Sequence, residues 1–308
     1  VSLASRNRFE TKSHPRNMEP SAKRARKCTT PKVSCSAVSC RPSQSGALEG
    51  ISIQYLIEYF LPDVQQFCGS GVGPDPTFRE IEHFVWGTPE KRFHPSRDFL
   101  GHATAIDSED GRPGTSLMNV LRQRDARFVG PAAYFLSWTW LYRVSDVVDG
   151  LRELCRQQDW DPSTTYVWMC FFVNNQRVWL LEAEPEPMSR PERIQECIDN
   201  VGGFIVLLDR HEGSTYFSRI WLIFELFVAL QLCPRRVHLA LPKQAHLALQ
   251  DALRTKSRRL AAIDADHAKA ANPAEERALK EMLSRTAGGM EAVNRQLGDL
   301  CAQLFAQQ

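Results

Sequence analysis

Glu225 places one carboxylate inside an otherwise apolar run. Between positions 220 and 233 the other clearly polar residue is Gln231. An unpaired carboxylate is costly to remove from water, so Glu225 must be paired with a base, held neutral or turned toward a cavity. The run is too short to cross a bilayer and predicts a buried helix.

Ser218 and Trp221 precede Glu225 by seven and four positions, so all three share one face of this predicted helix. An indole beside a carboxylate in a partly dry cleft would raise the pKa of the acid or hold the acid near a cationic ligand. The structural alternative, which residue chemistry alone favours, is a buried ion pair. Three arginines are candidates for it: Arg143, Arg177 and Arg219.

The elements that would position Glu225 alternate between strands and helices. Apolar runs at 132–136, 166–173, 203–208 and 237–241 predict strands, and segments of helical period at 144–157, 191–201 and 220–233 lie between them. This order is typical of a parallel sheet with helices on both faces, and strands that are apolar throughout favour burial on both sides. We predict an α/β domain over residues 131–245.

Three further segments flank this domain. Residues 1–45 are rich in Ser, Pro, Lys and Arg and predict a disordered basic tail. Residues 46–130 predict a helical leader with an irregular loop, in which an apolar stripe from residue 47 to 67 is interrupted by Pro62. Residues 246–308 predict helices that pack on the α/β domain; Asn272 is the expected cap of one of them, with Glu275 placed to reach back to it.

Charge and composition exclude several classes of protein. The first 45 residues hold ten Lys and Arg against two Glu, which leaves 28 basic and 34 acidic residues for the remainder, so the folded core is not expected to bind nucleic acid. The basic patch from Lys23 to Lys27 is read as a solvated tail, with nuclear import as the alternative. The nine Cys are scattered and include no Cys-x-x-Cys pair, so we predict neither a disulfide framework nor a metal site. We infer a reducing compartment, which we take as the cytoplasm. The sequence contains no stretch of about 18 apolar residues, so we predict no membrane insertion.

Polar residues gather where the predicted strands end. Ligands of parallel α/β sheets bind outside the carboxyl ends of the strands, so these residues, with Ser218 and Trp221, are our candidate ligand contacts. The alternative, favoured for Asp209, is that such side chains only bond the backbone of their own turn. The strand-end candidates are Ser137, Trp138, Asn174, Asn175, Gln176 and Asp209.

Three motifs carry a resemblance to known families. Tyr-Phe-Leu-Ser at residues 134–137 and Ser-Arg-Ile-Trp-Leu-Ile-Phe-Glu-Leu at 218–226 resemble the first strand and the Ser-x-x-Trp-x-x-x-Glu-Leu helix of Toll/interleukin-1 receptor (TIR) domains. The run at 166–176, ending Asn-Asn-Gln, is similar to a segment of fungal heterokaryon-incompatibility (HET) domains, whose Arg-x-Trp-x-x-x-Glu helix is matched by Arg219, Trp221 and Glu225. TIR-like proteins of algae and other protists look similar as well. The sequence departs from these patterns at Trp138 and Cys170.

The resemblance implies a flavodoxin-like fold and a signalling domain that associates with itself or with other TIR-like domains. It also implies NAD as a candidate substrate, because some such domains cleave the nicotinamide-ribose bond with a Glu that corresponds to Glu225. No cofactor is expected. The alternative is a non-catalytic interaction module in which Glu225 is structural. A dinucleotide oxidoreductase is disfavoured, because no Gly-x-Gly-x-x-Gly follows the first predicted strand.

Overall fold

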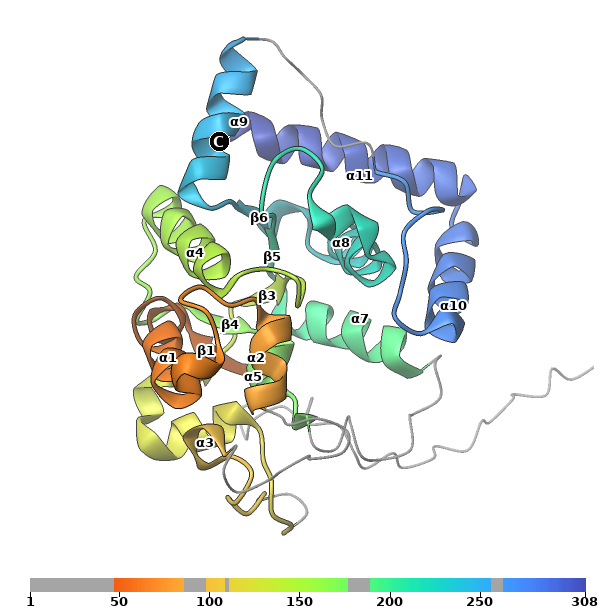
Figure 1. The fold of residues 1–308 in the computed structure, drawn as a ribbon. Helices are drawn as coiled ribbons and strands as arrows, with labels where there is room; N and C mark the ends of the chain where they lie inside the picture. Colours follow the sequence, from red (N-terminus) through yellow and green to blue (C-terminus); the bar gives the residue numbers. More distant parts are fainter. Residues whose placement is uncertain (1–46, 86–97, 109–110, 177–188, 256–262) are drawn as a thin grey trace, which may run out of the picture. The chain divides into compact units, whose positions relative to one another are not determined.

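A six-stranded sheet forms the centre of the computed structural model, which describes residues 47–85, 98–108, 111–176, 189–255 and 263–308 (Figure 1). The predictions for the tail, including Lys23 to Lys27, lie outside the described residues. The strand order is β2-β1-β4-β3-β5-β6. The strands are β1 (Glu49–Ser52), β2 (Val129–Pro131), β3 (Tyr134–Ser137), β4 (Tyr166–Trp168), β5 (Phe204–Leu207) and β6 (Val237–Ala240).

Four of these strands are parallel and correspond to the four predicted apolar runs. β3 pairs with β4 on one side and with β5 on the other, and β5 pairs with β6. Along the chain, the connection from β3 leads to β4, and the following strand, β5, lies on the opposite side of β3. The predicted mixed α/β architecture is confirmed, and the order of the strands reverses at β3.

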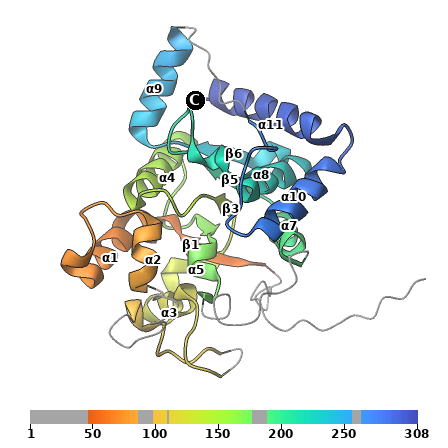
Figure 2. The same cartoon turned by 45° about the vertical axis from the view of Figure 1, so that its right-hand side comes forward.

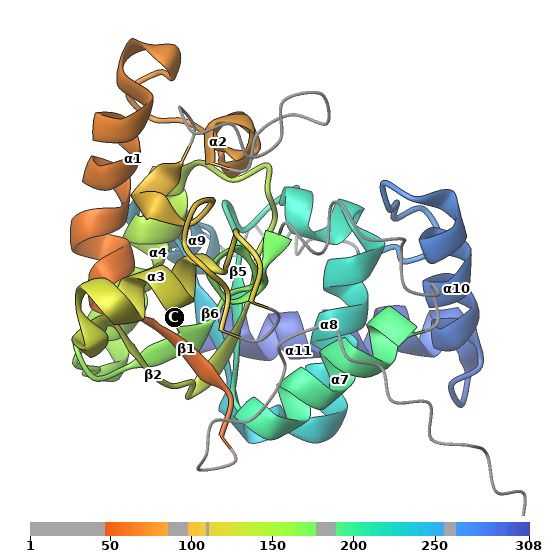
Figure 3. The ribbon, with the colours of Figure 1, turned by 90° about the horizontal axis from the view of Figure 1, so that it is seen from below.

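Helices cover both faces of the sheet, as predicted (Figures 1 and 3). Successive residues of β5 alternate between two buried clusters, with Phe204 and Val206 in one and Ile205 and Leu207 in the other. The first cluster is completed by α7 (Ser189–Val201), α8 (Ile220–Leu232), α9 (Lys243–Arg254), α10 (Pro273–Ser284) and α11 (Gly289–Ala306). The second is completed by α1 (Leu61–Cys68), α2 (Phe78–Val85), α3 (Leu117–Arg124) and α4 (Val144–Gln158).

The helix that carries Glu225 is the one most enclosed by other helices. α8 contacts α7, α10 and α11 as well as β3 (Figure 2). It begins and ends within a residue of the predicted run. α10 begins as predicted, because Asn272 Oδ1 accepts a hydrogen bond from the backbone N–H of Ala274 at 2.8 Å. The expected return contact of Glu275 is wrong, since its two carboxylate oxygens bind Trp221 and Arg190 instead.

The run at 166–173 is shorter as a strand than predicted. β4 ends at Trp168, and the chain turns into a short helix, α5 (Cys170–Val173). The carbonyl oxygen of Met169 accepts backbone hydrogen bonds from Phe172 at 2.9 Å and from Val173 at 3.1 Å. An apolar run does not by itself distinguish a buried strand from a buried turn of helix, and the helical turn buries Phe172 completely.

The leader contributes strands as well as helices, which corrects the prediction of a helical stripe from residue 47. β1 lies inside the sheet, antiparallel to both β2 and β4. At Gly50 a Cβ would lie 2.4 Å from the carbonyl oxygen of Val167, so glycine permits the close approach of β1 to β4. Helix follows directly after β1, as a π-helix (Tyr55–Phe60) that α1 continues without a break. Pro62 therefore lies inside one continuous helix and does not interrupt it.

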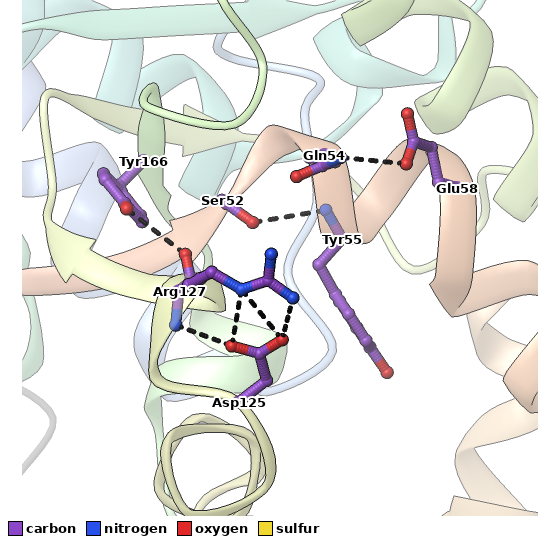
Figure 4. A network of polar contacts seen from close by, with 7 residues as sticks. All are labelled: Ser52, Gln54, Tyr55, Glu58, Asp125, Arg127 and Tyr166. Carbon is purple, nitrogen blue, oxygen red and sulfur yellow. Dashed lines mark hydrogen bonds and ion pairs between the residues drawn. The ribbon is translucent and has the colours of Figure 1, made fainter.

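Short polar contacts hold the chain where β1 and β2 join their neighbouring turns (Figure 4). Tyr166, at the start of β4, donates its hydroxyl to the carbonyl oxygen of Arg127 at 3.2 Å. The Arg127 guanidinium bonds Asp125, with Nη2 2.6 Å from Oδ2. Beyond β1, Ser52 Oγ accepts the backbone N–H of Tyr55 at 3.2 Å. The bond from Tyr166 to Arg127 joins β4 to the turn before β2, whereas the other two contacts are local to their turns.

Candidate functional site

Glu225 meets the end of the central strand β3. Its Oε2 lies 2.5 Å from the hydroxyl oxygen of Ser137, the last residue of that strand. Ser137 is fully buried, whereas Glu225 keeps partial solvent exposure. The two residues that the sequence assigned to a strand end and to a helix are therefore brought together where the strand order reverses, the usual position of ligands in such sheets.

Tyr216 extends this contact into a chain of hydroxyl groups. Its Oη lies 2.6 Å from Ser137 Oγ and 3.1 Å from the carbonyl oxygen of Leu222, one turn before Glu225 on α8. Tyr216 is fully buried in the turn that leads into α8. The tyrosine was not among the predicted site residues. The signal that indicates it is a phenol inside an apolar segment, because a buried tyrosine hydroxyl needs a hydrogen-bond partner.

Burial has the largest effect on the pKa values of Glu225 and Tyr216. It raises the pKa of Glu225 from an ordinary 4.5 to about 8, although the hydrogen bond from Ser137 acts in the opposite direction. Burial also raises the pKa of Tyr216 well above its usual range, and the nearby Glu225 carboxylate adds to this. At pH 7 the carboxyl group is therefore mostly neutral.

The expected ion pair of Glu225 does not form within the described part of the chain. Arg143 instead donates to the carbonyl oxygen of Asp75 at 2.7 Å and lies 3.6 Å from its carboxylate. Arg219 makes no ion pair with Glu225, and Arg177 lies outside the described residues. The ion-pair hypothesis is wrong for Arg143 and Arg219, and neutralisation by burial takes its place.

Trp138 and Cys170 lie on the side of the site that faces the second buried cluster. The Trp138 ring packs against Phe78 with centroids 4.4 Å apart, so this residue is part of the core. Its indole nitrogen is beside the Cys170 thiol without an oxygen or nitrogen partner among the described residues. Burial and then Glu225 raise the pKa of Cys170 to about 12, so the thiol stays protonated. Cys170 is a neighbour of Glu225 that the candidate list omitted.

The three polar residues after β4 bond within the protein. Asn175 Nδ2 donates to Asp107 Oδ2 at 3.1 Å and to the carbonyl oxygen of Gly114 at 3.0 Å. Gln176 Nε2 donates to the carbonyl oxygen of Cys170 at 3.0 Å, and Asn174 ends α5. The two bonds of Asn175 connect the segment after α5 to Asp107 and Gly114, and none of these contacts involves Glu225.

Asp209 follows β5 and accepts a hydrogen bond from Ser214 Oγ at 2.6 Å. Ser214 in turn meets the buried hydroxyl of Tyr142 at 3.3 Å. The Asp209 carboxylate thus bonds side chains, those of Ser214 and of Arg210, and the predicted bond to the backbone of its own turn is not what holds it. Ser218 lies in the 3-10 turn before α8 (Thr215–Ser218), exposed, and bonds the carbonyl oxygen of Thr215 at 2.7 Å; it does not share a helix face with Glu225.

Trp221 is directed to the C-terminal helices rather than to the carboxylate. Its indole N–H donates to Glu275 Oε2 at 2.9 Å, and the other oxygen of Glu275 pairs with Arg190. Side chains from α8, α10 and α7 are joined in this way. The structure therefore brings Ser137, Glu225 and Tyr216 into one site and places the remaining predicted residues around it or in other contacts.

The fold and site define a mixed α/β protein with a mostly parallel sheet and a partly exposed, mostly neutral acid, Glu225, at the end of its central strand. No family model, no curated protein and no solved structure matches the chain. Within the described ranges, no group of three or more His, Cys, Asp or Glu side chains is placed to hold a metal ion. None of the helices described is both long and apolar enough for a membrane span.

Proposed function

We propose that this chain is a TIR-like signalling domain of flavodoxin-like fold, and that its Glu225 acts in cleavage of NAD at the nicotinamide-ribose bond. The observation that carries the proposal is the position of Glu225, a partly exposed acid without a basic partner among the described residues, at the end of β3. The order of the parallel strands supports the fold assignment: numbered along the chain it is 2-1-3-4, the order with which flavodoxin-like sheets begin.

The chemistry of the bond explains why a carboxylate is useful at this position. Departure of nicotinamide leaves positive charge on the ribose, which a preplaced carboxylate stabilises. Only the ionised form of Glu225 does this, and with a pKa of about 8 roughly a tenth of the free protein is ionised at pH 7. The positive charge of the bound nicotinamide ring lowers the pKa of a nearby acid, so substrate binding favours the active form.

The test is release of nicotinamide from NAD by the purified, self-associated chain and by Glu225→Gln. The variant keeps the shape of the side chain and removes its charge, and we expect it to lose at least a hundredfold in rate. Glu153→Gln is the matched control, because Glu153 lies on α4 and pairs with Arg156 away from the site. Equal rates for wild type and Glu225→Gln, or no release under assembly conditions, would exclude the catalytic role.

A second function is favoured by the hydrogen-bond chain itself. Ser137, Tyr216 and Glu225 join β3 to α8, which is the contact expected of a structural acid in a non-catalytic domain that acts by association with itself or with other TIR-like domains. If Glu225→Gln alters stability and neither wild type nor the variant releases nicotinamide, the non-catalytic function replaces the catalytic one. Sedimentation over a range of protein concentrations then measures the association.

A further inference from the structure

Three hydrogen bonds in series run from Glu225 through Ser137 and Tyr216 to the backbone. The contacts are Glu225 Oε2 with Ser137 Oγ at 2.5 Å, Ser137 Oγ with Tyr216 Oη at 2.6 Å, and Tyr216 Oη with the carbonyl oxygen of Leu222 at 3.1 Å. The last acceptor is a carbonyl, which cannot donate, so the direction of the third bond is fixed.

That fixed end determines how many protons the series needs. If Tyr216 donates to Leu222, its oxygen accepts from Ser137, and the Ser137 oxygen must then accept from Glu225. A neutral Glu225 supplies this third proton and all three bonds form. An ionised Glu225 leaves two hydroxyl protons for three contacts, so Tyr216 turns toward Ser137 and its bond to Leu222 is lost.

We infer that Tyr216 is a positioning residue which, through Ser137, holds Glu225 in its neutral form in the resting protein. Tyr216 acts by accepting the Ser137 proton, which leaves the Ser137 oxygen free to accept from the acid. The inference deepens the proposed function, on which it rests for its consequence in catalysis: the site is kept uncharged until a cationic substrate arrives.

The other ionisable groups around α8 do not oppose this arrangement. Cys170 on α5 faces Glu225, and Cys301 on α11 and Tyr142 face Tyr216; these groups are neutral at pH 7. From α10 and α7, Glu275 and Arg190 meet α8 at Trp221, where they pair with one another. None of these groups supplies a free positive charge to an ionised Glu225.

The inference is tested by titrating the carboxyl carbon of Glu225 by carbon-13 NMR in wild type and variants. Tyr216→Phe removes the acceptor of the Ser137 proton, so Ser137 donates to Glu225 and the pKa of the acid falls by about one unit. Ser137→Ala removes the hydroxyl through which Tyr216 acts, so in that background Tyr216→Phe should leave the pKa of Glu225 unchanged. Tyr142→Phe is the matched control: it deletes another buried phenol, which bonds Leu207 and Ser214, and it leaves the pKa of Glu225 in place.

Two results would overturn the inference. One is a Tyr216→Phe protein in which the pKa of Glu225 is unchanged or raised, since a purely structural tyrosine has no reason to favour the neutral acid. If that variant does not fold, the carbonyl carbon of Leu222 is followed in wild type: ionisation of Glu225 should break its hydrogen bond with Tyr216 and shift its carbon-13 resonance with the pKa of Glu225, and an unchanged resonance would contradict the proposal. Neither measurement needs turnover, so a failure of nicotinamide release leaves the result intact.

Discussion

Ser137 and Glu225 stand 88 positions apart in the chain, and their side-chain oxygens meet at 2.5 Å. The contact joins the central strand of the sheet to the helix most enclosed by other helices. Because it involves a fully buried hydroxyl and an acid of raised pKa, the protonation of Glu225 is linked both to folding and to any chemistry at this site.

Glu225→Gln should change how stability depends on pH. The folded pKa of about 8 lies above the ordinary 4.5, so the folded protein binds this proton more tightly than the unfolded chain does. The resulting stabilisation is fully present below about pH 4.5 and is lost as the pH rises through 8. The glutamine variant does not ionise and should gain about 4 kcal/mol relative to wild type between pH 5 and 9, since wild type loses about 1.4 kcal/mol per pH unit from about pH 5 to 8. Urea unfolding at both pH values measures this; a constant difference between the two proteins would count against a raised pKa.

Nicotinamide release, if Glu225 carries it, should rise with pH. The carboxylate is the active form in the proposed reaction, and kcat/KM reports the pKa of the free protein. We expect kcat/KM to increase about tenfold per pH unit below pH 7 and to level off above about pH 8. The profile of kcat should be shifted to lower pH, because the bound nicotinamide cation favours ionisation. A rate that falls as the pH rises from 6 to 9 would indicate that Glu225 acts as a general acid instead.

The contact of Trp221 with Glu275 should contribute to stability and not to ligand binding. Trp221→Phe removes the indole donor, and Glu275→Gln removes the charge that pairs with Arg190, whose side chain is 13% exposed. We expect losses of about 1–2 and about 3–5 kcal/mol respectively. A double-mutant cycle in urea should give a coupling of about 0.5–1.5 kcal/mol. Additive losses would mean that the bond contributes nothing.

Gly50→Ala should disturb the pairing of β1 with β4. The added Cβ would lie 2.4 Å from the carbonyl oxygen of Val167, a backbone atom that cannot rotate away. We expect a loss of about 1–3 kcal/mol and faster amide exchange in β1 and β4. Gly73→Ala is the control, because a Cβ at that position meets no atom within 4 Å. Equal stability of the two variants would contradict the close packing of β1.

The sequence predicts most of the elements because their signals are local. α8 and the strands β5 and β6 are apolar runs bounded by polar or turn residues, and the stripe of α11 follows one helical face. The prediction from sequence fails at Glu49–Ser52. This four-residue strand lies directly before a helix, and its apolar residues continue the apolar stripe of that helix, so the sequence does not separate the two elements. Its inclusion in the sheet depends on a distant partner, Val167, that no local pattern identifies.

The candidate site is predicted only in part, for a related reason. Ser137 and Glu225 stand out individually, as a hydroxyl at a strand end and a charge in an apolar helix. The role of Tyr216 depends on its distance to Ser137 in the fold, and the bonds of Asn175 depend on a loop more than sixty residues earlier in the chain. The expectation of an arginine partner treated Glu225 as charged, whereas burial keeps it mostly neutral.

The position of β1 and β2 also determines which edges of the sheet are open. Without them, β4 would be an open edge strand with unpaired backbone groups, on which another chain could add a strand. β1 occupies those groups, and the edge that results, β2, has three residues and ends in Pro131, which lacks an N–H to donate. Strand addition is therefore disfavoured on this side of the sheet, and the edge at β6 is the one to which a further strand could be added.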